Sequence, residues 1–141
     1  QIAYQLYSLD NLMYNVGSGM IGDLSETIDA DIFLKKLKKD MKINCIKYTD
    51  IKNKSIKKIA ICGGSGSFLL KLAKNAGADI FISSDFKYHD FFDSESIIIA
   101  DIGHYESEQF TNNLIHDFLS KKFTSFAFLL SKINTNPIKY L

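Results

Sequence analysis

Short apolar runs alternate along this chain with longer stretches in which apolar residues recur at helical spacing. The short runs predict six strands, at residues 1–9, 45–48, 56–62, 79–82, 96–100 and 125–130. The helical spacing predicts helices at residues 30–41, from residue 67 to a carboxyl-terminal cap at 75–77, at 86–92, and from Tyr105 onward. Strands that alternate with helices indicate an α/β fold, with a mostly parallel sheet covered by helices on both faces.

Two of the predicted helices have a clear apolar face. In the helix at 30–41 this face consists of Phe33, Leu34, Leu37 and Met41, and the lysines between them are expected to face solvent. In the last helix the residues expected to face the core are Phe110, Leu114, Ile115, Phe118 and Leu119. The glycines of segment 17–22 predict a sharply turning loop between the first strand and the first helix.

Composition narrows the class of protein. A chain of 141 residues with 46% hydrophobic content is expected to fold as one globular unit. The net charge is only +1 and there is no arginine, which argues against a nucleic-acid-binding role. No segment is long enough to span a membrane, so we expect a cytoplasmic protein. The two cysteines, Cys45 and Cys62, lie in apolar runs and are expected to be small buried hydrophobic residues.

The strongest chemical signal lies where two predicted strands end. The strand at 56–62 runs into Gly63, Gly64, Ser65 and Gly66, whose backbone N–H groups are available to a ligand. The strand at 96–100 leads to His104 and Glu108, which are four residues apart and therefore project from one face of a helix. Such a pair is able to hold a metal ion. The alternative is that His104 caps the helix and that Glu108, like Glu106, only complements the helix dipole.

The glycine loop itself has two interpretations. It resembles the first turn of a dinucleotide or S-adenosylmethionine fold, with Asp85 ending the next strand where such folds hold a ribose. In that pattern, however, Leu69 stands where a third glycine is expected. The alternative is a plain turn between a strand and a helix, in which the glycines only let the chain reverse.

Two further histidines are candidates of different kinds. His89 follows another strand end and is expected to face the same crevice as His104, where it would act as a catalytic group; the alternative is a surface histidine. His116 lies in the middle of the last helix and is expected to be solvated.

Half of the 16 acidic residues lie between residues 79 and 108, which suits a divalent cation better than an anion.

Four segments together carry a resemblance to a known family. They are Gly17–Leu24, Cys62–Ser67, Asp85–His89 and Gly103–Glu108, in this order along the chain. In this arrangement the chain resembles the carboxy-terminal half of the Nif-three-like dinuclear-metal family, whose members are also called GTP cyclohydrolase 1 type 2 homologues. The resemblance covers nearly the whole chain.

The resemblance implies a site and an assembly. It makes His104 and Glu108 metal ligands in a cytoplasmic, toroidal homohexamer that holds two divalent ions per full-length subunit, with Zn, Mn or Fe as candidates. The other ligands of the family, two adjacent histidines and an aspartate, come from an amino-terminal half that this chain does not contain. Residues 1–11 resemble the end of a ferredoxin-like insert, and residues 12–141 resemble the carboxy-terminal half of the metal-binding domain. We therefore expect the chain to be a fragment of a larger α/β domain.

The functional expectation is a divalent-metal-binding, hydrolase-like protein whose small-molecule substrate is unknown. Two alternatives stay open. One is a non-catalytic hexameric scaffold or regulatory metal binder. The other is a protein that binds a nucleotide or S-adenosylmethionine through Gly63–Ser67.

Overall fold

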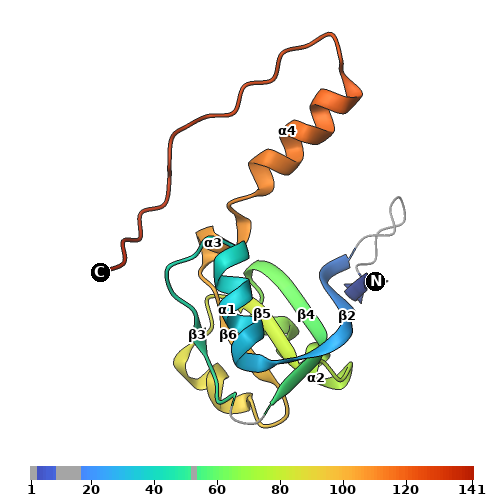
Figure 1. The fold of residues 1–141 in the computed structure, drawn as a ribbon, viewed down its shortest axis with the longest axis vertical. Coiled ribbons are helices and arrows are strands. Elements are labelled where there is room, and N and C mark those ends of the chain that lie inside the picture. The colour runs from blue at the N-terminus through green and yellow to red at the C-terminus, as the bar shows by residue number, and fades with distance from the viewer. Residues whose placement is uncertain (1–2, 9–16, 52–53) are drawn as a thin grey trace.

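A computed structural model describes residues 3–8, 17–51 and 54–141, and these form an α/β body followed by a long carboxy-terminal arm (Figure 1). The strands are β1 (Ala3–Ser8), β2 (Gly17–Asp29), β3 (Lys47–Tyr48), β4 (Ser55–Ser65), β5 (Ile80–Ser84) and β6 (Ile98–Asp101). The α-helices are α1 (Ala30–Asp40), α2 (Leu70–Asn75), α3 (His104–Glu108) and α4 (Thr111–Lys122). Two short 3-10 helices are η1 (Ser67–Leu69) and η2 (Tyr88–Asp93).

The six strands form one mixed sheet in the order β1-β2-β4-β5-β6-β3. Strands β4, β5 and β6 run parallel to one another, whereas β1, β2 and β3 join the sheet through antiparallel pairs. The expected α/β class is confirmed, but the expectation of a mostly parallel sheet is wrong. Apolar runs reveal that strands exist but carry no information on their direction, and the parallel part is confined to the centre of the sheet.

The segment at residues 17–22 is the clearest local error of the sequence analysis. It is not a loop but the start of β2, which pairs with β1 on one side and β4 on the other. Gly19 has φ +66°, so the positive φ expected for this segment is present within the strand. Of the proposed insert end at residues 1–11, only β1 lies within the described residues, and positions 1–2 and 9–11 lie outside them.

Both faces of the sheet are covered, as expected. Along β5 the side chains alternate between two cores, with Phe81 in one cluster and Ile80 and Ile82 in the other. The first cluster also contains Leu69, Leu70 and Ala73 from η1 and α2. The second contains Leu34 from α1, with Phe33, Leu37 and Met41 packed against it, which confirms the apolar face predicted for this helix. The sheet therefore holds its central parallel strands rigidly between two apolar layers.

The carboxy-terminal part differs most from the expectation. Helix α4 extends away from the sheet, and the chain beyond it runs back toward the body without regular structure (Figure 1). Leu114 and Phe118, expected in the core, are 70% and 63% exposed, and the strand expected at 125–130 is absent from this described segment. Helix α3 ends at Glu108, and α4 begins at Thr111 as a separate helix that makes no extensive contact with the described strands of the sheet. Its apolar pattern indicates a face that needs a partner but does not identify that partner.

The cysteines also differ from one another. Cys62 is half-buried beside the first cluster, where burial raises the pKa of its thiol. Cys45 is exposed, so its expected burial is wrong. Strand β3 begins only at Lys47, so Cys45 lies outside it.

None of the helices in the described part of the chain has the length and apolar character that a membrane-spanning helix requires.

Candidate metal centre

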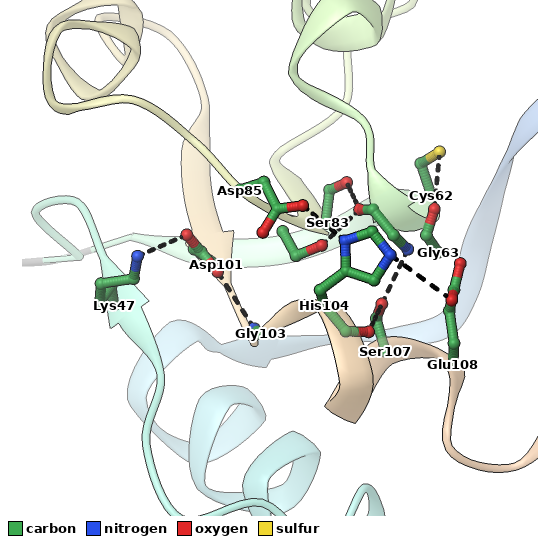
Figure 2. Close-up of polar contacts among 12 residues, drawn as sticks. Lys47, Cys62, Gly63, Ser83, Asp85, Asp101, Gly103, His104, Ser107 and Glu108 are labelled. Carbon is green, nitrogen blue, oxygen red and sulfur yellow. Dashed lines mark hydrogen bonds and ion pairs between the residues drawn. The ribbon is translucent and has the colours of Figure 1, made fainter. Parts of the chain in front are cut away.

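The candidate site lies where the three parallel strands end. Gly64 is near the end of β4, and Asp85 follows β5. His104 begins α3, which is joined to the end of β6 by two residues. The carboxyl ends of parallel strands meet at one edge of a sheet, which is where α/β proteins place their ligands. Figure 2 shows the side chains of Asp85, His104 and Glu108 gathered at this edge.

His104 and Glu108 face each other across one turn of α3, as the sequence predicts. The distance from His104 Nε2 to Glu108 Oε2 is 3.6 Å, and each side chain is 51% exposed. An ion with tetrahedral bonds of about 2.0–2.2 Å would hold its ligand atoms about 3.4 Å apart. The observed separation of the nitrogen and the oxygen therefore fits a shared metal ion.

The other nitrogen of the His104 ring is held by a residue from a different strand. Asp85 Oδ2 lies 2.5 Å from His104 Nδ1. The hydrogen bond to this carboxylate, with charge attraction from Asp85 and Glu108, raises the pKa of His104 above its usual 6.5, although partial burial lowers it. The Nδ1 atom of the ring is thus hydrogen-bonded to Asp85, and the Nε2 atom is directed toward Glu108.

The raised pKa of His104 predicts how stability of the metal-free protein depends on pH. The contribution of the Asp85 contact should be fully present below pH 6.5 and should be lost as the pH rises through the raised folded value. We expect Asp85→Asn to lower the free energy of unfolding in chelator most at about pH 5 and least at about pH 8. Denaturant titrations across this range measure the difference, and a constant difference would contradict the prediction.

The glycine loop is fastened by three serine hydroxyls. The Gly64 N–H donates to Ser107 Oγ at 2.8 Å, and Ser107 Oγ donates in turn to the His104 carbonyl. The Gly64 carbonyl accepts hydrogen bonds from Ser83 Oγ and Ser84 Oγ. The N–H and the carbonyl of Gly64 are therefore both hydrogen-bonded within the protein. This favours the structural interpretation of the loop over a phosphate-binding one.

Gly64 also keeps open the space beside the two candidate ligands. A Cβ built on Gly64 would lie 2.7 Å from Glu108 Oε1 and 3.3 Å from His104 Nε2. Any side chain there would occupy the region in which both ligand atoms meet. The donor set and this open space fit a divalent ion, although no group of three or more His, Cys, Asp and Glu side chains among the described residues is arranged to hold one. Two protein ligands are fewer than the three that catalytic zinc sites commonly use.

The remaining candidate residues do not join this arrangement. His89 lies exposed on η2, and the side chains bonded to the His104 ring are Asp85 and Glu108. Its role as a catalytic group stays a prediction. His116 lies on α4, where its Nδ1 is 3.2 Å from Asp117 Oδ1, and its side chain is 31% exposed. Ile115 was expected to face the core as part of the same helix, but α3 ends at Glu108 and Ile115 is 50% exposed.

Glu106 was expected only to complement the helix dipole, but in the structure it also anchors the carboxy-terminal arm. Its side chain is 6% exposed, and its Oε1 accepts hydrogen bonds from Asn136 Nδ2 and Tyr140 Oη of the carboxy-terminal arm, both at 3.0 Å. Its Oε2 has no hydrogen-bond partner among the described residues. Burial and this carboxylate raise the pKa of Tyr140. No local pattern around residue 106 reveals these contacts, which come from thirty residues away.

Loss of the Glu106 carboxylate should release the arm. Glu106→Ala removes the shared acceptor of Asn136 and Tyr140, and we expect a cost of about 1–3 kcal/mol with faster proteolysis of residues 123–141. Tyr140→Phe removes only one of the two bonds and should give a smaller change in the same direction. Limited proteolysis with mass spectrometry measures both variants, and equal cleavage rates in wild type and Glu106→Ala would contradict the anchoring role.

Comparison with known proteins places this chain in a family. The model of the Duf34/NIF3 (NGG1p interacting factor 3) family matches residues 3–137. A GTP cyclohydrolase 1 type 2 homolog of Staphylococcus epidermidis is 36% identical over 129 residues, which cover 88% of this chain and 35% of that protein. The homolog of Listeria innocua is 29% identical over 148 residues, covering 98% of this chain and 38% of that protein.

Solved structures agree with the sequence comparison. A Bacillus cereus protein related to NIF3 superposes with a TM-score of 0.77 at 25% identity, over 94% of this chain and 38% of that one. A Staphylococcus aureus protein superposes with a TM-score of 0.76 at 28% identity, over 89% and 42% of the two chains. The chain thus spans little more than a third of the length of the curated relatives that it matches. Because the family model matches almost the whole chain, the chain belongs to the Duf34/NIF3 family.

Proposed function

We propose that this chain is the carboxy-terminal part of a divalent-metal-binding, hydrolase-like protein, in which His104 and Glu108 are metal ligands. The observation that carries the proposal is the 3.6 Å separation of His104 Nε2 and Glu108 Oε2 beside the open Cα of Gly64. A helix cap or a dipole contact requires neither this convergence nor the absence of a side chain at residue 64. Membership of the family supports the same assignment.

The remaining ligands must come from outside the two side chains on α3. In the proposed arrangement residues 12–141 form half of a metal-binding domain, and the other half supplies the further groups that a catalytic site needs. The matched relatives are more than twice as long as this chain, which leaves room for such a half. The proposed full-length protein holds two divalent ions per subunit and assembles as a hexamer.

Within this proposal each described residue has a chemical task. Bound divalent ions would lower the pKa of a water molecule, which could then attack a substrate as hydroxide at neutral pH. Glu108 and the Nε2 of His104 bind the ion, and Ser107 fastens the glycine loop to the helix that carries both. His89 is retained as a group that would move a proton or orient the substrate, on the strength of its position after β5.

The two alternatives make different use of the same edge of the sheet. A scaffold or regulatory metal binder would keep the ions and lack turnover. A nucleotide or S-adenosylmethionine site would need the backbone N–H groups of the glycine loop, but Ser107 already accepts the hydrogen bond of Gly64 N–H. The residue at the third glycine position, Leu69, is fully buried in the first core cluster. The structure thus favours a metal-binding function at this edge.

The deciding experiment is elemental analysis of the full-length protein, followed by a substrate screen. Metal per subunit is measured with and without prior chelation, and cyclic nucleotides, phosphoesters and amides are then tested with and without added divalent ions. Bound metal with metal-dependent turnover supports the hydrolase proposal. Bound metal without turnover favours the scaffold. Absence of bound metal, together with saturable calorimetric binding of S-adenosylmethionine or a dinucleotide, would overturn the proposal in favour of the nucleotide alternative.

A further inference from the structure

We propose that Asp85 is a positioning residue that fixes the His104 ring and aims its Nε2 at the metal ion. This inference rests on the proposed function, because it concerns the same ligand. The observation is the contact between Asp85 Oδ2 and His104 Nδ1, which joins the end of β5 to the start of α3. The two residues are nineteen positions apart, so the contact exists only because the strands β5 and β6 are neighbours.

The backbone at Asp85 is held in an uncommon conformation. Asp85 has φ +58°, and Lys42 is the other non-glycine residue with a positive φ in the described part of the chain. Aspartate and asparagine tolerate this left-handed region better than most side chains, although it still costs free energy. The conformation turns the chain at the end of β5 and presents the carboxylate to His104.

The residues on either side of Asp85 fix its position. Ser84 is fully buried and donates its hydroxyl hydrogen bond to the Gly64 carbonyl at the end of β4. Phe86 is 6% exposed and stacks edge-on against Phe81 in the first core cluster. The half-exposed aspartate thus lies between two buried neighbours, which fix the backbone that presents its carboxylate to the His104 ring. Rigid support of this kind is what a positioning residue needs.

The chemistry of imidazole explains why this contact matters for a metal. The two ring nitrogens are distinct, and the hydrogen bond made by one of them selects the tautomer in which the other can bind an ion. When Nδ1–H donates to the Asp85 carboxylate, the lone pair of Nε2 is directed to the space between Gly64 and Glu108. The carboxylate also makes the ring a stronger ligand by polarising it.

The same contact removes the argument that Asp85 serves a nucleotide. In a dinucleotide fold the acidic residue at the end of the second strand accepts hydrogen bonds from a ribose. Here the carboxylate of Asp85 is directed at a histidine of the adjacent helix (Figure 2). Asp85 therefore belongs to the candidate metal centre through His104.

Substitutions at Asp85 can distinguish the effect of its carboxylate on metal binding from the effect of its backbone conformation. Asparagine keeps a hydrogen-bond acceptor without charge and tolerates positive φ, whereas glycine keeps the conformation and removes the acceptor. The affinity of the full-length protein for Zn²⁺ is measured by competition with a chromophoric chelator at one pH. We expect about 10-fold weaker binding for Asp85→Asn and about 100-fold weaker binding for Asp85→Gly, with an unchanged number of ions at saturation.

Two controls make the outcomes distinguishable. Asp117→Asn removes the same charge beside His116 on α4 and should leave the Zn²⁺ affinity unchanged. His104→Ala should lower the number of bound ions. If His104→Ala loses an ion while both Asp85 variants bind like Asp117→Asn, the positioning role is overturned and the metal site stands. If His104→Ala binds like wild type, both proposals fail.

A spectroscopic measurement separates positioning from a purely structural role. In the metal-free protein, ¹⁵N chemical shifts of the His104 ring report which nitrogen carries the proton. At a pH at which the His104 ring is neutral, we expect the proton on Nδ1 in wild type and a mixture of tautomers in Asp85→Gly. An unchanged tautomer in Asp85→Gly would overturn the proposal even if that variant were less stable.

Discussion

His104→Ala and Glu108→Ala should each abolish most of the metal bound at their shared site in the full-length protein. Each substitution removes one of the two proposed ligand atoms, which lie 3.6 Å apart, so the ion should lose one of its bonds to the protein. Removal of a first ligand commonly has a larger effect than the 10- to 100-fold loss seen for supporting residues. Elemental analysis gives metal per subunit, and melts with and without chelator show how much of the stability comes from the ion.

Matched controls separate ligation from helix capping. His116→Ala removes a histidine on α4, and Glu95→Ala removes an exposed glutamate between η2 and β6, so both should retain full metal content. If His104 and Glu108 only stabilised the end of α3, their loss would cost about 1 kcal/mol with metal unchanged. Full occupancy in both alanine variants, with only a lower melting temperature, would refute the ligand assignment.

Local patterns along the chain predicted that His104 and Glu108 converge, but they did not predict the arrangement of the sheet around them. The His104–Glu108 pair was recognisable because four residues make about one helical turn, a relation that depends on no distant contact. The helix at 30–41 was predictable for the same reason, and it is observed at Ala30–Asp40. In both cases the information lies within a dozen residues.

Features that depend on distant residues were missed or misjudged. The direction of the strands follows from how β2 returns between β1 and β4, which no short window of sequence contains. Glu106 is buried by Asn136 and Tyr140, and the contact of Asp85 with His104 requires β5 and β6 to be neighbours. The apolar residues of α4 were expected to face the core, but Leu114 and Phe118 are largely exposed in the described part of the chain. Periodicity reveals which face is apolar and leaves its partner unspecified.

Gly64→Val should destabilise the protein by about 1–2 kcal/mol and eliminate metal binding at the proposed site. Gly64 has φ +63°, a conformation that costs an L-residue about 1–2 kcal/mol. The new side chain would also overlap the region next to Glu108 Oε1, 2.7 Å from the built Cβ, and the flexible, half-exposed Glu108 side chain would have to move away from His104. Denaturant titration in chelator measures the loss of stability without any contribution from bound metal.

Two further variants keep this prediction testable if the valine variant does not fold. Gly64→Ala incurs the conformational cost with a smaller overlap, so it should fold with reduced stability and still bind less metal, because its Cβ displaces Glu108. Ser65→Ala changes the exposed neighbour, whose side chain is not needed by either the loop or the ion, and should resemble wild type in both measurements. Normal metal content in a folded Gly64→Ala variant would show that the space beside residue 64 is not where the ion binds. Wild-type stability in the same variant would contradict the need for a positive φ, and with it the argument that the loop shapes the site.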